Sequence, residues 1–124
     1  YTKGLGTTVK EITDAAGHEE YLDKISFSAF ESVKEKIKGN KFVIVCGIET
    51  HICVLQTVID LAANGYIPVV VEDCVSSRKP NDRRIALKRM KEEGAILTTY
   101  ESILFELLKV AGTETSKKIQ RLIK

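Results

Sequence analysis

Two hydrophobic patterns alternate along the chain from residue 41 onward. Residues 41–48 form a short, uninterrupted apolar run rich in β-branched side chains, which is typical of a strand buried on both faces. Residues 52–64 instead place apolar side chains at helical spacing, with Thr50 positioned to cap the helix and Gly65 to end it. This part of the sequence therefore predicts one strand followed by one helix.

The same order of patterns occurs twice more. Residues 67–71 and 95–99 predict two further buried strands. A helix that opens at Pro80 and stops at Gly94 separates them, and another helix follows over residues 101–111. Strands that alternate with helices across short links predict a parallel sheet in an α/β fold.

The two ends of the chain are patterned less regularly. Residues 4–8 predict a loop, and residues 24–27 predict the end of a short extended segment. Ser28 is placed to cap a helix that Gly39 closes. Residues 113–124 favour a final helix with one apolar docking face.

Composition adds limits to this picture. With 124 residues, of which 44% are hydrophobic and 29% charged, the chain is expected to form a single globular domain over residues 1–124. Basic residues alternate with acidic ones and the net charge is only +2, which argues against a nucleic-acid partner. No apolar run approaches the roughly 18 residues that cross a membrane, and no signal peptide is visible, so no membrane partner is expected.

Cysteine usage and the first residue refine the expectation. The three cysteines are an odd number, and each lies in an apolar or strand-like segment, which favours free thiols in a reducing compartment such as the cytoplasm. The chain begins at Tyr1 and its only methionine is Met90. We therefore expect it to be a piece of a longer protein or a processed form.

The turn between the first predicted strand and its helix is the natural place for chemistry, because ligands of open parallel sheets bind beyond the carboxyl ends of the strands. Cys53 lies in the first turn of that helix, where the helix dipole and the free amides favour the nucleophilic thiolate. The same amides could hold an oxyanion as a carbonyl is attacked. Position alone leaves open that Cys53 is a small buried apolar residue, which is the interpretation for Cys46 and Cys74.

The two histidines offer less chemistry. His51 lies two residues before Cys53 and could act as a base, although a histidine in a turn more often makes a structural hydrogen bond or lies at the surface. Neither His51 nor His18 has a partner at metal-ligand spacing. We therefore expect no metal and no other cofactor.

Several motifs together resemble one family of enzymes. Residues 47–57, Gly-Ile-Glu-Thr-His-Ile-Cys-Val-Leu-Gln-Thr, resemble the nucleophile motif of the isochorismatase-like cysteine hydrolases. Residues 72–78, Glu-Asp-Cys-Val-Ser-Ser-Arg, are similar to that family's Asp-Ala-Val-Ser-Ser-Arg stretch, and residues 24–30 to its lysine-bearing segment. The two ends of the chain, residues 1–9 and 118–124, resemble the isochorismatase domain-containing branch of the family.

This resemblance covers essentially the whole chain and implies both a fold and a catalytic set. The implied fold is a Rossmann-like arrangement of three layers, a parallel sheet with helices on both faces, with the N-terminal strands missing from this chain. The family's catalytic cysteine, lysine and aspartate make Cys53 the nucleophile and Lys24 the lysine. The family's aspartate lies upstream of its lysine, and Asp14 and Asp23 are in the wrong context for that role. The segment that would carry it is expected in the full protein.

The resemblance also implies how negative charge would be held at the turn. The family has a cis peptide bond without proline just before the nucleophile turn, which here falls at Ile48–Glu49. The backbone amide of Glu49 would then face the oxyanion together with that of Cys53. The residues expected to bind the oxyanion or the substrate are Glu49, Ile48, Thr50, His51 and Phe27.

The implied function is hydrolysis of an amide- or ester-like bond in a small molecule. The nicotinamidases of the family typically have Ala-Thr-Asp where residues 49–51 are Glu-Thr-His, so a nicotinamidase is disfavoured. The alternative is a non-catalytic binding or assembly protein that retains the fold. A thiol-redox protein that pairs Cys46 or Cys74 with Cys53 is disfavoured by the lack of Cys-x-x-Cys spacing. Apolar positions on the outer faces of the predicted helices favour a homo-oligomer.

Overall fold

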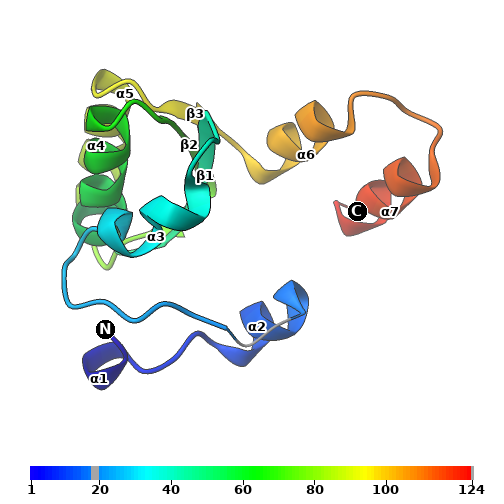
Figure 1. Cartoon of the computed structure of the whole chain (residues 1–124). Helices are drawn as coiled ribbons and strands as arrows, with labels where there is room; N and C mark the ends of the chain where they lie inside the picture. Colours follow the sequence, from blue (N-terminus) through cyan, green and yellow to red (C-terminus); the bar gives the residue numbers. More distant parts are fainter. Residues whose placement is uncertain (18–19, 124) are drawn as a thin grey trace.

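A parallel sheet of three strands forms the centre of the structure, a computed structural model that describes residues 1–17 and 20–123 (Figure 1). The strands are β1 (Phe42–Ile48), β2 (Ile67–Ser76) and β3 (Ile96–Thr98), in the spatial order β1-β2-β3. Both neighbouring pairs are parallel. The predicted parallel sheet of an α/β fold is therefore confirmed.

β2 is the central strand, and its pairing with β1 is interrupted once. The two strands run in register up to Val45 opposite Val70, and pairing resumes with Gly47 opposite Val75. β2 holds more residues than β1 between these two pairs, so its chain bulges there. Residues 69–71 of β2 are buried, as a continuous apolar run in a central strand should be.

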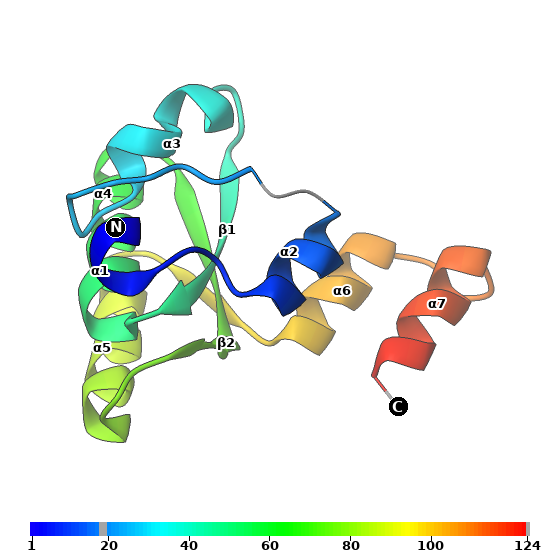
Figure 2. The ribbon, with the colours of Figure 1, turned by 90° about the horizontal axis from the view of Figure 1, so that it is seen from below.

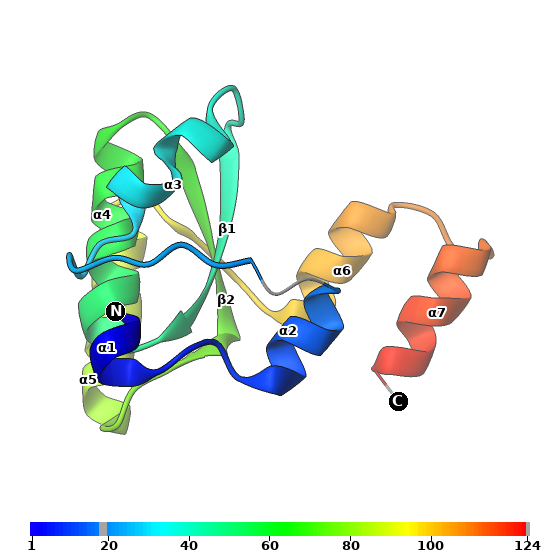
Figure 3. The ribbon, with the colours of Figure 1, turned by 60° about the horizontal axis from the view of Figure 1, so that its bottom comes forward.

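Helices cover both faces of the sheet, which gives the three layers that the resemblance implies (Figure 3). α4 (Leu55–Ala63) and α5 (Pro80–Glu92) pack against one face, and α6 (Tyr100–Leu108) contacts β2 from the other. The main core lies between the sheet and the helices α4 and α5, where Val58 and Met90 are completely buried.

Smaller elements surround this core. α3 (Phe30–Ile37) lies beside α4 and buries Phe30. α7 (Glu114–Leu122) packs against α6 and extends away from the sheet (Figures 1 and 2). α1 (Thr2–Leu5) and α2 (Lys10–Ala16) bury no side chain of their own.

The ends of the elements differ from the sequence prediction in three places. Residues 4–8 are not all loop, because α1 includes the first two of them. The helix α2 was not predicted, although its Lys10 and Asp14 form an ion pair one turn apart. Residues 24–27 are irregular rather than extended strand. α6 ends at Leu108, three residues earlier than predicted, because the next residue has a positive φ of 62°.

β1 is the open edge of the sheet, so the prediction that it is buried on both faces is wrong. Among the described residues it pairs only with β2, and Phe42, Ile44 and Ile48 are 55%, 51% and 70% exposed. The segment with α1 and α2 lies beyond this edge and apart from it (Figure 1). An apolar run identifies a strand but not its neighbours, because burial depends on what packs against it.

Candidate active site

A turn at the carboxyl end of β1 carries the candidate nucleophile. The peptide bond between Ile48 and Glu49 is cis, as the resemblance implies. η1 (Thr50–Val54) follows as a π-helical turn, in which the N–H of Val54 donates to the carbonyl of Glu49 at 3.3 Å. Cys53 is half-buried in this turn, and α4 begins directly after it. The turn therefore lies where the sequence predicts chemistry.

Thr50 does not cap a helix, contrary to the sequence prediction. It is the first residue of η1, and the capping position belongs to Glu49, whose side chain makes no capping bond. The Thr50 side chain is fully buried, and its Oγ1 has no hydrogen-bond partner among the described residues. A π-helical turn shows nearly the same apolar pattern as an α-helix, so the sequence could not distinguish the two.

The Glu49 side chain ties the turn to the loop after β2. Nε of Arg78 donates to Oε1 of Glu49 at 3.0 Å, and the backbone N–H of Arg78 donates to Oε2 at 3.4 Å. The same Oε2 lies 3.5 Å from Nδ1 of His51. The Glu49 carboxylate thus contacts groups on both the turn and the loop after β2.

His51 lies between side chains from two other segments. Its Nδ1 is 3.0 Å from Oγ of Ser77, and its Nε2 is 3.8 Å from Oδ2 of Asp82. A hollow of about 420 Å³ opens beside the ring and is lined by His51, Arg78, Lys79 and Asp82. Two cationic side chains, a histidine and a carboxylate suit a polar ligand better than an apolar one.

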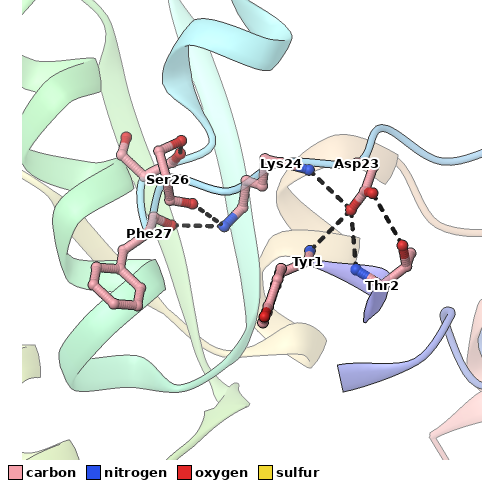
Figure 4. A network of polar contacts seen from close by, with 7 residues as sticks. Tyr1, Thr2, Asp23, Lys24, Ser26 and Phe27 are labelled. Atoms are coloured by element: carbon pink, nitrogen blue, oxygen red, sulfur yellow. Dashed lines mark hydrogen bonds and ion pairs between the residues drawn. The ribbon is translucent and has the colours of Figure 1, made fainter. Parts of the chain in front are cut away.

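Lys24 lies on the loop between α2 and α3 rather than on the turn. Its ammonium donates to the carbonyl oxygens of Ser26 and Phe27, both at 2.8 Å, so the loop curls around its own lysine (Figure 4). The preceding Asp23 points the other way and accepts hydrogen bonds from Thr2 (Figure 4). The Lys24 ammonium keeps one further N–H with which it can donate.

Two hydrogen bonds in series join this loop to the nucleophile. The backbone N–H of Ala29 donates to Oγ1 of Thr57 at 3.0 Å, and that hydroxyl donates to the carbonyl of Cys53 at 2.7 Å. Thr57 lies one helical turn after Cys53, so its hydroxyl reaches back along the helix. Sequence analysis missed this link, although a threonine four residues after the cysteine was the available signal.

The structure thus brings most of the predicted site residues onto one turn: Ile48, Glu49, Thr50, His51 and Cys53. Lys24 and Phe27 lie on the separate loop that Thr57 joins to the turn, and the Phe27 side chain is exposed. Sequence analysis assigned no role to Ser77, Arg78 or Asp82. Their contacts with the turn span more than 25 residues, so no local spacing could have shown them.

The two other thiols are exposed, so the prediction that Cys46 and Cys74 are buried is wrong. Cys46 lies on the open edge strand, and Cys74 lies near the bulge in β2. Partial desolvation of its sulfur, followed by the charge of Asp73 and the nearby Cys46, raises the pKa of Cys74. The prediction failed because a strand at an edge has a free face.

Two other kinds of site have no counterpart within residues 1–17 and 20–123. There, no three metal-binding side chains gather closely enough to hold a metal ion. No helix in that part of the chain is both long and apolar enough to cross a bilayer. His18, which sequence analysis considered as a ligand, lies outside the described residues.

Comparisons with known proteins find similar sequences along the whole chain. The family model described as "Isochorismatase domain" matches residues 3–102. Isochorismatase domain-containing protein 1 from Danio rerio is 39% identical over 100% of this chain and 45% of its own length. A secreted isochorismatase effector from Phytophthora sojae is 41% identical over 100% of this chain and 63% of its own length. The chain thus spans less than two thirds of these curated relatives.

Solved structures share the fold. The MAR1 ribonuclease from Caenorhabditis elegans has a TM-score of 0.89 and 41% identity, over 99% of this chain and 65% of that one. A nicotinamidase from Bacillus subtilis has a TM-score of 0.59 and 26% identity, over 69% of this chain and 52% of that one. The described sheet and its helices therefore have counterparts in proteins named for two different reactions.

Proposed function

The chain belongs to the isochorismatase family, and from this membership we propose that it is a hydrolase that uses Cys53 to attack an amide- or ester-like carbon of a small molecule. The observation that supports this most is the place of Cys53, half-buried on η1 between the carboxyl end of β1 and the start of α4. Ligands of parallel sheets bind at such ends, and the first amides of a helix can hold an anion.

In the proposed reaction, the Cys53 sulfur bonds to the carbonyl carbon and the carbonyl electrons move onto oxygen. The backbone amides of Glu49 and Cys53 hold this oxyanion. When the intermediate collapses, the amine or alcohol leaves with the proton that the thiol gave up, and a thioester remains. Water then attacks the thioester and releases the acid and the free thiol.

Lys24 is proposed as the residue that stabilises negative charge in this reaction. Its loop is joined to Cys53 through Thr57, and its ammonium has one N–H left after the bonds to Ser26 and Phe27. A fixed ammonium attracts both a thiolate and an oxyanion. Lys24→Ala should therefore lower hydrolysis more than Lys24→Arg, which keeps the charge.

The surroundings of the turn favour a small substrate with both apolar and polar parts. Phe27 and Ile48 present exposed apolar side chains. The hollow beside His51 presents Arg78, Lys79 and Asp82. We propose that the former contact the body of the substrate and the latter its polar group, with Thr50 supporting the turn from within.

Selective alkylation tests the nucleophile. Cys46 and Cys74 are more exposed than Cys53, so accessibility alone predicts that iodoacetamide labels them first. If Cys53 is an activated nucleophile, it should instead label at least about tenfold faster near neutral pH. A protease that cuts after glutamate separates the three thiols into residues 36–49, 50–72 and 73–92 for mass spectrometry. Equal rates, or slower labelling of Cys53, would contradict the proposal.

A panel of amides and esters tests the reaction itself. Cys53→Ala should abolish hydrolysis, while Cys46→Ser, a change at an exposed thiol outside the turn, should leave it intact. A Cys53→Ala protein that matches the wild type in every assay would favour the alternative, a binding or assembly protein that retains the fold. RNA belongs in the same panel, because a structure 41% identical to this chain is named a ribonuclease. The net charge of +2 disfavours RNA as the substrate.

We also propose a homo-oligomer in a reducing compartment such as the cytoplasm. Exposed apolar side chains on β1 and α6, among them Ile44 and Leu107, support self-association. All three cysteines are free thiols. Sedimentation should give a mass above 13.8 kDa. Since one relative is named a secreted effector, cell fractionation is the test of location.

A further inference from the structure

Two thiols outside the proposed nucleophile turn occupy neighbouring positions on adjacent strands. Gly47 of β1 pairs with Val75 of β2 in the parallel register. Cys46 directly precedes the first of these residues, and Cys74 directly precedes the second. Between this pair and the preceding one, Val45 with Val70, β1 has only Cys46, whereas β2 has residues 71–74, so Cys46 lies across from the short stretch that ends at Cys74.

Both thiols also point to the same face of the sheet. Val75 belongs to the core beside α4 and α5, and Val45 packs against that core. Successive side chains of a strand point to opposite faces, so Cys46 and Cys74 point away from these helices. Both cysteines are exposed there, as this alternation requires.

The spacing of neighbouring strands suits a covalent link between the two. Gly47 and Val75, which directly follow the two cysteines, are paired at the usual strand spacing of about 4.8 Å, and a disulfide needs a Cα separation of about 4.4 to 6.8 Å. The two sulfurs already influence one another, since Cys46 contributes to the raised pKa of Cys74 after desolvation and Asp73.

The part of β2 that carries Cys74 is held in place from both sides. The Arg83 side chain on α5 donates to the backbone carbonyls of Glu72 and Val75, which flank it. Oδ1 of Asp73 accepts a hydrogen bond from the backbone N–H of Tyr100 at 2.9 Å. Although β2 bulges here, Cys74 is therefore fixed opposite β1, and little entropy is lost when it pairs.

We propose that Cys46 and Cys74 form a reversible disulfide when the protein meets a low-molecular-weight disulfide, such as oxidised glutathione. The thiolate of one cysteine attacks a sulfur of the small disulfide, which leaves a mixed disulfide and releases one small thiolate. The other cysteine then loses its proton and attacks the protein sulfur of that mixed disulfide. The Cys46–Cys74 bond forms and the second small thiolate leaves, so two protein thiols are oxidised and one disulfide is reduced to two thiols.

This site is separate from the proposed hydrolase. Cys53 lies beyond the end of β1, on η1, and takes no part in the exchange. Because attack requires the thiolate and the pKa of Cys74 is raised, the exchange should accelerate as the pH rises above neutral. A dithiol reductant should restore both thiols.

The experiment treats the folded chain with excess oxidised glutathione, blocks the remaining thiols and digests it without reduction by the protease that cuts after glutamate. The expected product is residues 36–49 joined to residues 73–92, with the Cys53 peptide blocked as a free thiol. A folded protein that carries glutathione on Cys46 and Cys74 separately, or a link that includes Cys53, would overturn the proposal.

The same oxidation in concentrated guanidinium chloride is the matched control. Cys46 and Cys53 are seven residues apart, whereas Cys46 and Cys74 are 28 apart. Loop closure in an unfolded chain therefore favours the Cys46–Cys53 pair by about eightfold. The folded chain should reverse this preference, and the same product ratio in both conditions would show that the strands do not direct the pairing.

Two variants complete the test. Cys53→Ser should still form the linked peptide, because Cys53 is not a partner. Cys46→Ser should instead stop at a mixed disulfide on Cys74 that carries one glutathione, since no second thiol lies beside it. Both changes replace a sulfur by an oxygen of similar size, and circular dichroism identical to the wild type verifies the fold. A Cys46→Ser protein that forms a Cys53–Cys74 link at the wild-type rate would contradict the assignment.

Discussion

Asp23 binds the start of the chain with a single carboxylate. It accepts hydrogen bonds from the backbone N–H and the hydroxyl of Thr2, both at 3.0 Å, and its Oδ1 lies 3.1 Å from the terminal ammonium of Tyr1. These contacts lower the pKa of Asp23 to about 2. The hydrogen bond from the backbone N–H of Thr2 contributes most, followed by the Tyr1 ammonium and the Thr2 hydroxyl. Each of these donors prefers the charged carboxylate.

The ionisation of Asp23 should therefore resist acid. Its ordinary pKa is 3.8, so this carboxylate stabilises the folded arrangement fully above that pH, and the stabilisation is lost as the pH falls toward 2. At pH 3 the group should be about nine-tenths ionised, which carbon NMR of the carboxyl can measure. Asp23→Asn should abolish this signal and free the Thr2 amide. A titration midpoint near the ordinary value would contradict the contacts described here.

α6 begins where two separate side chains satisfy its first amides. Oγ1 of Thr99 accepts a hydrogen bond from the N–H of Ser102 at 3.3 Å, and Asp73 of β2 accepts one from the N–H of Tyr100. The first cap is local, whereas the second attaches the helix to the central strand. The four N–H groups at the start of a helix lack partners within it, so both caps stabilise its position.

Removing the local cap should weaken the helix measurably. Thr99→Ala leaves the N–H of Ser102 without its side-chain partner, and we expect the free energy of unfolding to fall by about 1 kcal/mol. Thr99→Ser retains the hydroxyl and should lose much less. Urea unfolding followed by circular dichroism makes the comparison, and equal losses in the two variants would mean that the cap is not the stabilising contact.

Elements with clear beginnings and ends were the ones that sequence could predict. α5 starts at Pro80 and stops before Gly94 as predicted, and Cys53 lies on the predicted turn. The predictions failed where a neighbour decides the outcome. The exposure of β1 and of Cys46 follows from an open edge, and the tie between Glu49 and Arg78 joins residues 29 positions apart. Patterns along a chain report periodicity, whereas these features depend on packing in space.

The stability of the whole molecule depends mainly on one of its two helical layers. The buried cluster consists of residues from α4, α5 and β2 together with Val54 of η1 and Ala95. In contrast, α6 has no buried residue, and α7 buries only Ser116. Apolar burial contributes roughly 25 cal/mol per Å². Global unfolding should therefore respond to changes between the sheet and α4 or α5 far more than to changes elsewhere.

Met90 and Ile85, which both lie on α5, allow the position of the stabilising core to be tested on a single helix. Met90 is fully buried in the core, and Ile85 is 51% exposed. Met90→Ala should lower the free energy of unfolding by about 2 to 5 kcal/mol, whereas Ile85→Ala should cost about 1 kcal/mol or less. Urea titrations with a common slope measure both. Similar costs for the two variants would show that the core does not lie where the structure places it.

The outer side of β1, which has no strand partner within residues 1–17 and 20–123, favours association with a second chain. The outer amides and carbonyls of an edge strand form a row onto which another extended chain can add. The sequence of β1 holds neither proline nor a charged side chain, the two features that usually block such addition. If the added strand is the β1 of a second copy, its other side is already paired with its own β2, so the two open edges close against each other. The fraction of free monomer then depends on protein concentration, as it does for any reversible dimer.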